Sequence, residues 1–452
     1  MKSSLSKLKH RPLLRNFLLC GFVAVTLFIG SVICWRHNRV SSIPDVGEPF
    51  DVAAYLAKFD IEVNAFDVLG EASKMLIEIE KKPKYRNFSS SWIFPVKLTT
   101  LQREYLAETD PALDKWLSAS DIPAGYEVHP RDVNVYSTLE ISQNSRAMTG
   151  RILTRVRQKL NEGDTEAATE LLQQLLNLNL LFRNQSLITR LCGIATYNMY
   201  TSELPYLLQF EQWTVEDLRT LQQITQQHRV ADPPISESIK FEYFIARHAL
   251  DDKLKNRSIA TTISREDEVA RRVLNLIFDN WLTHCDLPTA ERPPCISHTC
   301  NSYSLSAWFE PDTSAMQCQV QFFTGENADL LLDSYHRLGS THGLFNGALG
   351  SPKNIAAIVE DRDNSRQELA LTLIALAIYF RELGQFPESL EQLVPEYLDA
   401  VPINRDVQAG KPEQVGTPID YKVEEGNALL MPVEPTLQFT IYPPGGFPRY
   451  TE

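Results

Sequence analysis

The sequence predicts a mainly α-helical protein with a single N-terminal transmembrane helix, an array of helical hairpins and a small α+β module at the C-terminal end. Three observations lead to this fold class. An uninterrupted apolar run occupies residues 17–35, apolar side chains recur at three- and four-residue spacings through residues 50–284, and residues 353–452 join an apolar helix to short strand-like segments. With 452 residues, of which 43% are hydrophobic and 22% charged, the chain is long enough for a buried core.

The charge distribution argues against a nucleic-acid partner. The net charge is −13, and the first 39 residues hold seven basic and no acidic side chains, so 37 basic and 57 acidic residues remain for the rest of the chain. A nucleic-acid surface needs concentrated positive charge. We therefore expect no nucleic-acid binding, and seven cysteines are too few for a disulfide-rich scaffold.

The apolar run at residues 17–35, FLLCGFVAVTLFIGSVICW, predicts a membrane anchor. As a helix rising 1.5 Å per residue it would extend about 28 Å, close to the roughly 30 Å of a bilayer's hydrocarbon core. A cleaved signal peptide is the alternative, but its apolar region is usually shorter and ends in an A-x-A-like pattern that is missing here. No second run of this length occurs, so we expect a single crossing.

Basic residues on the two sides of this segment predict its orientation. Five Lys or Arg residues lie within residues 1–16, and two follow within the linker at residues 36–49. Because the more basic side of a span stays in the cytoplasm, we expect a cytoplasmic N-terminus in the inner (cell) membrane. The remaining chain would then be periplasmic or extracellular.

Residues 50–284 are predicted to form the helical array. The spacing of apolar residues predicts one amphipathic helix over 50–81 and two antiparallel helices over 145–160 and 167–182. Gly163 and Asp164 mark the break between these two.

Two capping boxes predict further helix starts in the array. Thr214 is followed three residues later by Asp217, and Ser264 is followed by Asp267. No strict 34-residue repeat occurs, so the prediction is a hairpin array and not a named repeat family. Such an array is a plausible surface for protein partners.

Residues 285–352 change character. Alternating apolar and polar residues predict a strand at 316–323, with 303–309 as its expected partner. The glycine-rich stretch 339–350 lacks the order of a phosphate-binding loop, so we expect a surface loop there.

Four cysteines of this region, Cys285, Cys295, Cys300 and Cys318, are disulfide candidates. They lie close together in sequence, in a part of the chain that the topology places outside the cytoplasm, which favours one or two disulfides. Three pairings are possible, and the sequence leaves the choice open.

A metal site is the alternative use of these residues. The candidate ligands are His284, Cys295, His298 and Cys300, which together with Cys285 form the pattern H-C-x9-C-x2-H-x-C. Zinc accepts such ligands, although the usual C-x2-C pairs are missing and an oxidising compartment withholds free thiolate. The corresponding functional alternative is a metal-assisted enzyme of the cell envelope.

No catalytic motif was found among nucleophile elbows, phosphate-binding loops, H-E-x-x-H or dinucleotide fingerprints. We therefore predict no catalytic residues and no cofactor. Glu360, Asp361 and Asp363 form a carboxylate cluster, which we interpret as a solvated cap before a helix.

The C-terminal module carries the most specific pattern. An apolar helix over Leu369–Leu383 is predicted to stop at Gly384, and Phe386 with Pro387 opens a second short helix. The positions that define the pattern are Tyr379, Gly384, Phe386, Pro387, Leu390, Leu393 and Pro395.

This pattern resembles the soluble part of G-type (major) pseudopilins of type II secretion. The resemblance implies a helix, a turn at Gly384, a short helix and then a small sheet, with Tyr379 and Leu390 sharing one small core. The chain lacks the G-F-T-x-x-E processing motif before its apolar run, so it is not itself a pilin subunit.

The order of segments also resembles that of membrane-anchored helical proteins of planctomycete-type bacteria whose role is not known. The shared features are a V-N-A segment at residues 63–65, the phrase SLITRLCGIA at 186–195 and the pseudopilin-like end. Together these observations predict a non-enzymatic scaffold or interaction protein of the envelope, with protein partners and a link to secretion.

Overall fold

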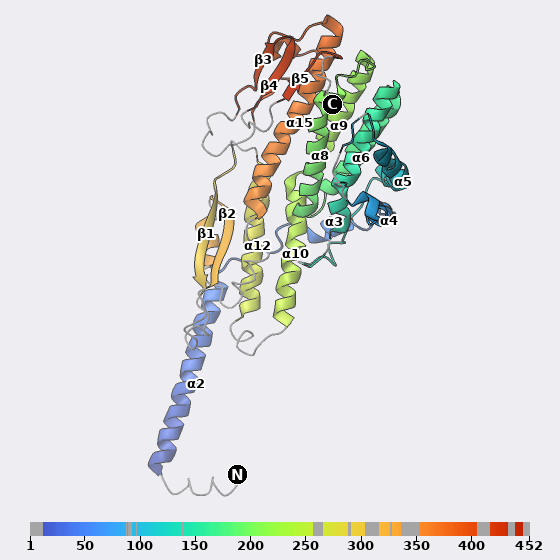
Figure 1. The fold of residues 1–452 in the computed structure, drawn as a ribbon. Coiled ribbons are helices and arrows are strands. Elements are labelled where there is room, and N and C mark those ends of the chain that lie inside the picture. Colours follow the sequence, from blue (N-terminus) through green and yellow to red (C-terminus); the bar gives the residue numbers. More distant parts are fainter. Residues whose placement is uncertain are drawn as a thin grey trace. The chain divides into compact units, whose positions relative to one another are not determined.

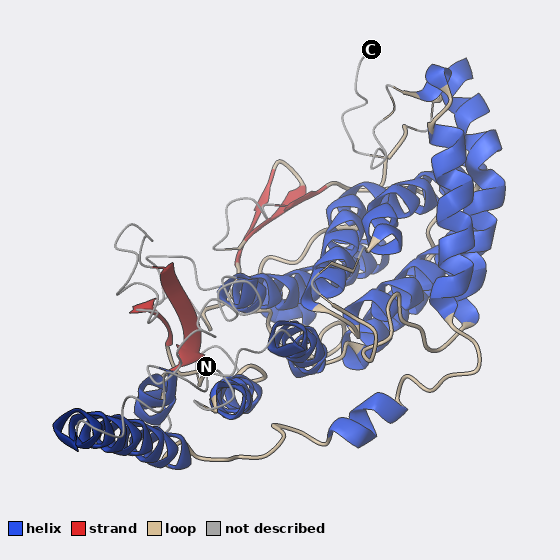
Figure 2. Ribbon diagram, turned by 90° about the horizontal axis from the view of Figure 1, so that it is seen from below, coloured by secondary structure: helices blue, strands red, loops and turns tan. Residues whose placement is uncertain are grey.

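The computed structural model describes residues 12–86, 88, 93–95, 97–134, 136–137, 139–255, 265–287, 291–302, 316–325, 328–335, 352–404, 416–432 and 439–445. Within these ranges the protein is mainly α-helical, as predicted, with twelve α-helices and two small antiparallel sheets (Figure 1). Figure 2 shows how few strands accompany the helices. As far as their residues are described, none of the helices combines the length and apolar character of a membrane crossing.

The chain divides into two compact units. Unit 1 consists of Met1–Phe50, Ala246–Asn280 and Pro294–Gly350, and unit 2 of Asp51–Ile245, Trp281–Pro293 and Ser351–Glu452. Helices α10 (Ile235–Lys255) and α12 (Glu266–His284) each contribute to both.

Unit 1 contains helix α2 (Pro12–Ser41), strands β1 (Cys295–Ser302) and β2 (Met316–Phe323), and helix α13 (Ala328–Tyr335). The predicted strand at 316–323 is confirmed, but it pairs with Cys295–Ser302 and not with the expected 303–309. The Asn280 side chain holds the end of the hairpin, because it both accepts from and donates to the backbone of Phe323. Residues 303–309, 339–350 and the Ser264 cap lie outside the described residues.

Unit 2 begins with helices α3 (Val52–Ala57), α4 (Ala65–Glu80) and α5 (Thr100–Leu117), followed by the 3-10 turn η3 (Ser118–Asp121). Helices α4 and α5 pack against each other. The single helix predicted over 50–81 is wrong, because Asn64 starts a new helix. Its Oδ1 accepts from the backbone of Phe66 at 3.1 Å, as a helix N-cap does, so the apolar spacing continues across a real break.

The middle of unit 2 consists of consecutive helices: α6 (Glu140–Glu162), α7 (Thr165–Arg183), α8 (Leu187–Leu207), α9 (Val215–Ala231) and the start of α10. Helices α6 and α7, and α7 and α8, pack against each other as sequential neighbours, whereas α9 packs against α7 and α15. The break at Gly163 and Asp164 is confirmed: Gly163 adopts a φ of 83°, and Asp164 caps α7. The capping box of Thr214 and Asp217 is confirmed at the start of α9.

The C-terminal segment supplies a long helix, α15 (Pro352–Leu383), then the 3-10 turn η5 (Leu390–Leu393) and the sheet β3 (Asp420–Glu424), β4 (Asn427–Met431) and β5 (Phe439–Ile441). Its strand order is β3-β4-β5. The helix ends at Leu383 as predicted, with Gly384 at a φ of 73°, but it begins well before Leu369.

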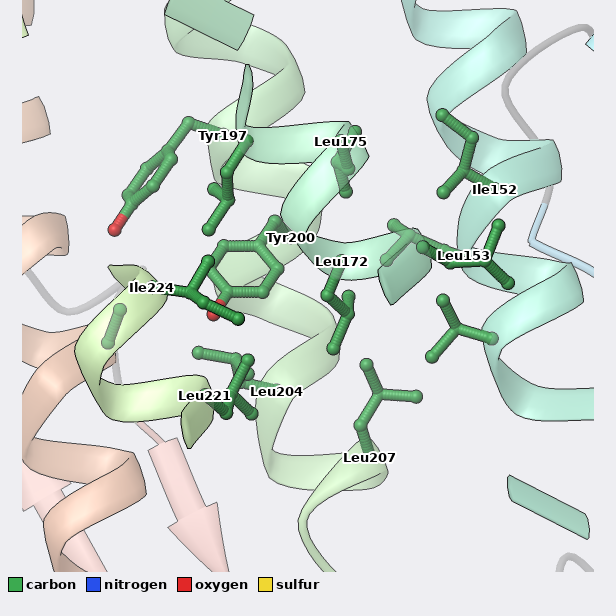
Figure 3. Packing of buried hydrophobic residues seen from close by; sticks show 14 of the residues in the cluster. Ile152, Leu153, Leu172, Leu175, Tyr197, Tyr200, Leu204, Leu207, Leu221 and Ile224 are labelled. Carbon is green, nitrogen blue, oxygen red and sulfur yellow. The ribbon is translucent and has the colours of Figure 1, made fainter. Parts of the chain in front are cut away.

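One continuous core joins this segment to the hairpins. Leu172 and Leu175 of α7, Tyr200 of α8 and Leu221 of α9 lie in one packed interior (Figure 3), and the buried face of α15 belongs to the same cluster. The β3–β5 sheet adds Leu430 to it. The C-terminal module and the array are therefore packed as one hydrophobic body.

Candidate functional site

A cluster of buried charges lies where helices α7, α8, α9 and α15 of unit 2 meet. Arg183 is the last residue of α7, and its side chain is fully buried. Its Nη1 lies 2.6 Å from Asp232 Oδ2 and 2.6 Å from Asp363 Oδ2, while Nη2 lies 3.1 Å from Asp363 Oδ1. Arg183 therefore binds Asp363 of α15 through two hydrogen bonds, and it also binds Asp232, the C-cap residue of α9.

A second arginine extends the cluster from the first turn of α8. Arg190 Nε lies 2.9 Å from Glu360 Oε2, and Nη2 donates to the other oxygen of the same carboxylate. Its Nη1 donates to the backbone carbonyl of Arg183 at 3.0 Å. Since that carbonyl belongs to the last turn of α7, Arg190 also satisfies an open acceptor at a helix end.

Gln367 bridges the carboxylates. Its Nε2 lies 2.7 Å from Asp232 Oδ2 and 3.0 Å from Asp363 Oδ2. Gln367 stands one turn after Asp363 on α15, so the amide and the carboxylate lie on the same side of that helix.

The charges of the cluster do not cancel completely. Two guanidinium groups face the three carboxylates of Asp232, Glu360 and Asp363. Burial would raise the pKa of Asp363, but the ion pair and hydrogen bonds with Arg183 hold it below its usual value. Burial dominates at Asp232, whose pKa is raised. The excess negative charge is therefore least favourable at Asp232.

A neutral layer lies beside the charges. Asn179 Oδ1 accepts from Arg183 Nε at 2.6 Å and lies 2.9 Å from His228 Nε2, while Asn179 Nδ2 donates to the Gly193 carbonyl at 2.6 Å. Because Asn179 Oδ1 is an acceptor, the Nε2 of His228 carries the proton. The Tyr197 ring stacks on the imidazole with centroids 4.9 Å apart.

Gly193 allows helices α7 and α8 to approach closely at this layer. A Cβ atom at this position would lie 3.0 Å from Arg183 Cγ and 3.3 Å from Phe182 Cβ. The small residue therefore leaves room for the arginine stem and keeps its own carbonyl within reach of Asn179.

A cavity of about 470 Å³ adjoins the cluster inside unit 2. Its polar lining includes Asp232, Glu360, Gln367, Asp286 and Arg292. Charges of both signs face it, and Arg292 Nη1 lies 3.6 Å from the carboxylate of Asp361. The cluster can thus neutralise charge and lock helices together, but every carboxylate in it already faces an arginine.

The interpretation of Glu360, Asp361 and Asp363 as a solvated cap is wrong. All three lie inside α15 and are at most 9% exposed. The sequence reasoning missed their partners Arg183 and Arg190. The available signal was an arginine within or directly after an apolar helix, as in LLNLNLLFR and SLITRLCGIA, because a charge on a buried face needs a counter-charge.

The cysteine candidates are spread over both units. Cys285, in unit 2, is a buried free thiol whose Sγ lies 3.7 Å from Asp286 Oδ1, and burial raises its pKa. In unit 1, Cys300 stands directly opposite Cys318 across the β1–β2 ladder, whereas Cys295 stands opposite Phe323. The disulfides themselves stay a prediction.

The alternative metal ligands do not share one face. His298 and Cys300 occupy positions of the same parity on β1, whereas Cys295 is of the other parity and therefore on the opposite face. His284 ends α12 within the part of that helix assigned to unit 2. Among the side chains that the structure describes, no group of three or more His, Cys, Asp or Glu is placed to hold a metal ion.

Of the residues predicted to define the C-terminal module, Phe386, Leu390 and Leu393 are buried in the continuous core of unit 2, whereas Gly384 and Pro395 are exposed. Phe386 is 7% exposed, and its ring centroid lies 4.7 Å from that of Phe380 on α15. Leu390 and Leu393 are buried beside it, and Tyr379 packs against the same cluster. The hydroxyl of Tyr421 on β3 donates to the Pro387 carbonyl at 2.8 Å, which ties the sheet to the turn.

These contacts describe a structural site that joins the C-terminal helix to the hairpin array. Comparison of the chain with family models, with curated proteins and with solved structures finds no match.

Proposed function

We propose that this chain is a single-pass membrane-anchored envelope protein whose unit 2 is a non-enzymatic interaction module outside the cytoplasm. The observation that carries the proposal is the surface of helix α2. Its 30 residues correspond to about 45 Å of helix, and the side chains of residues 16–31 are exposed throughout. Phe17, Phe22 and Phe28 are 77%, 73% and 70% exposed. Such a surface is unfavourable in water and suits lipid.

The folded part of unit 1 begins where this apolar surface ends. Val40 is completely buried and Ile43 is 1% exposed, and Arg272 donates to the Ile43 carbonyl at 2.7 Å. The described side chains of α2 from residue 16 to residue 31, most of the stretch that the sequence predicts to cross the membrane, have no protein cover. The greater number of basic residues before that stretch supports a cytoplasmic N-terminus.

A groove in unit 2 supports the interaction role. It has a volume of about 880 Å³ and lies between α9 and residues 395–403. Gln222, Gln223 and Gln226 line its α9 side. The Gln222 amide already donates to the Tyr397 carbonyl at 2.6 Å. Because glutamine amides both donate and accept hydrogen bonds, Gln223 and Gln226 suit the backbone of an extended peptide segment better than an apolar small molecule.

The C-terminal module supports a link to secretion. Its order of helix, left-handed Gly384, short helical turn and three-stranded sheet agrees with what the resemblance to G-type pseudopilins implies. We therefore propose that the partner is another component of an envelope assembly. The alternative of a metal-assisted enzyme has less support, because the β1 register separates Cys295 from His298 and Cys300.

The interaction role can be tested by site-specific photo-crosslinking in intact cells. A photoreactive residue at Gln223, which is exposed and lines the groove, should give a discrete crosslinked product. The same residue at Tyr136 of unit 2, which is 86% exposed and outside the groove, is the control and should give none. Equal crosslinking at both positions, or none at Gln223, would contradict the proposed surface.

A further inference from the structure

The register of the β1–β2 hairpin places two cysteines opposite one another. Eight residue pairs form this antiparallel ladder, from Cys295 opposite Phe323 to Ser302 opposite Met316, and Cys300 is the partner of Cys318. The sequence alone left three pairings of the four candidate cysteines open. The ladder distinguishes them.

The Cα separation expected for such a pair lies within the range found for disulfides. Residues directly opposite in an antiparallel ladder have Cα atoms about 4.5 to 5.5 Å apart and occupy the same face of the sheet. Disulfides join residues whose Cα atoms are about 4.4 to 6.8 Å apart. The register of Cys300 and Cys318 is therefore compatible with a disulfide between them.

The other two cysteines fit this bond less well. Cys295 is five positions before Cys300 on β1, which places it on the opposite face of the hairpin from both Cys300 and Cys318. Cys285 belongs to unit 2, where its buried thiol lies beside the Asp286 carboxylate. Burial disfavours the thiolate that disulfide formation requires.

We propose that Cys300 and Cys318 form a single disulfide across the hairpin, and that Cys285 and Cys295 do not pair with them. The thiolate of one cysteine attacks an oxidant that itself carries a disulfide, and the second thiolate then displaces the oxidant from the mixed disulfide. One S–S bond forms in the protein, and the two electrons and two protons of the cysteine thiols pass to the oxidant, which leaves as its dithiol. Formation in the cell rests on the proposed location outside the cytoplasm.

The bond would fix the register of the hairpin. A slip of the ladder by one residue would place Cys300 and Cys318 on opposite faces, and such a slip is least resisted in a two-stranded sheet with polar residues on both strands. The covalent link excludes this alternative.

The test is peptide mass mapping of the full chain, purified in detergent from cells in which free thiols were alkylated at lysis. We expect one linked peptide pair containing Cys300 and Cys318, with Cys285 alkylated only after denaturation. Cys300→Ser should turn Cys318 into an alkylated thiol, and the control Cys295→Ser should leave the linked pair unchanged.

A second arm separates the pairing from the location. The purified chain is reduced and then exposed to oxidised glutathione, and the linked pair should return in wild type but not in Cys300→Ser. Formation only in this arm would support the pairing and contradict the extracytoplasmic location. The pairing is overturned if Cys300 and Cys318 stay alkylated in both arms, if either links to Cys285 or Cys295, or if they retain stoichiometric zinc with His298 on the same face.

Discussion

His228 should make the free energy of unfolding depend on pH. Its side chain is 3% exposed in the last turn of α9, with Nε2 2.9 Å from Asn179 Oδ1 and its ring stacked on Tyr197. Burial, together with the positive charge of Arg183, lowers the pKa of His228 to about 3. The imidazole is therefore neutral in the folded protein at every pH at which the unfolded chain takes up a proton.

The direction and the size of this pH dependence follow from the different proton binding of the folded and unfolded states. In the unfolded chain the pKa of His228 is about 6.5, so between that pH and about 3 only the unfolded state binds the proton. The contribution of the neutral His228 side chain to the free energy of unfolding is complete above pH 6.5 and is lost as the pH falls toward 3. Because each pKa unit corresponds to about 1.4 kcal/mol, roughly 2 kcal/mol should be lost between pH 7 and pH 5.

Urea unfolding of the purified chain at pH 7, 6 and 5 provides the assay, with His228→Gln as the matched variant. Glutamine can still donate to Asn179 but does not titrate. The wild type should lose about 2 kcal/mol more than the variant over this interval. Asp232, whose pKa burial raises, titrates in both proteins and cancels in the difference. Parallel pH profiles would refute the account of a buried neutral imidazole.

Three further changes test the packing of unit 2. Arg183→Met leaves the buried Asp363 carboxylate without its bidentate partner. It should lower the free energy of unfolding by about 3 to 5 kcal/mol in urea titrations. An unchanged unfolding midpoint would show that the pair is dispensable. Gly193→Ala places a Cβ 3.0 Å from Arg183 Cγ and should cost about 1 to 3 kcal/mol in the same titration, a prediction that fails if the variant is as stable as wild type. Phe386→Ala should lower the free energy of unfolding by about 3 to 5 kcal/mol and speed proteolysis of the C-terminal segment. The control Leu383→Ala, at a residue that is 56% exposed, should change neither quantity. Equal effects of the two substitutions would contradict the packing of Phe386.

Local signals in the sequence were sufficient for several helix ends. The capping box of Thr214 and Asp217, the left-handed Gly163 and the stop at Gly384 each depend on a few neighbouring residues, and each lies where predicted. The break at Asn64 was missed because the apolar spacing on its two sides stays in phase, so periodicity alone did not reveal a new start.

The buried charge cluster could not be predicted in the same way. Arg183 and Asp363 are 180 residues apart in sequence, and a single sequence does not show which distant charges meet. The polar first half of α15 was therefore predicted to be exposed to solvent, although its carboxylates face arginines in the interior of unit 2. The sequence also could not show which cysteine lies opposite Cys300, because strand register depends on the pairing of distant segments and not on local composition.

The central claim is that residues 17–35 cross a membrane once and carry the rest of the chain out of the cytoplasm. The most direct measurement is the activity of a reporter enzyme that folds only outside the cytoplasm, fused after residue 452, with a second fusion lacking residues 1–40 as the control. We predict that the full-length fusion is active and sediments with membranes, and that the shortened fusion is inactive. Activity confined to a reporter that works only in the cytoplasm would contradict the account.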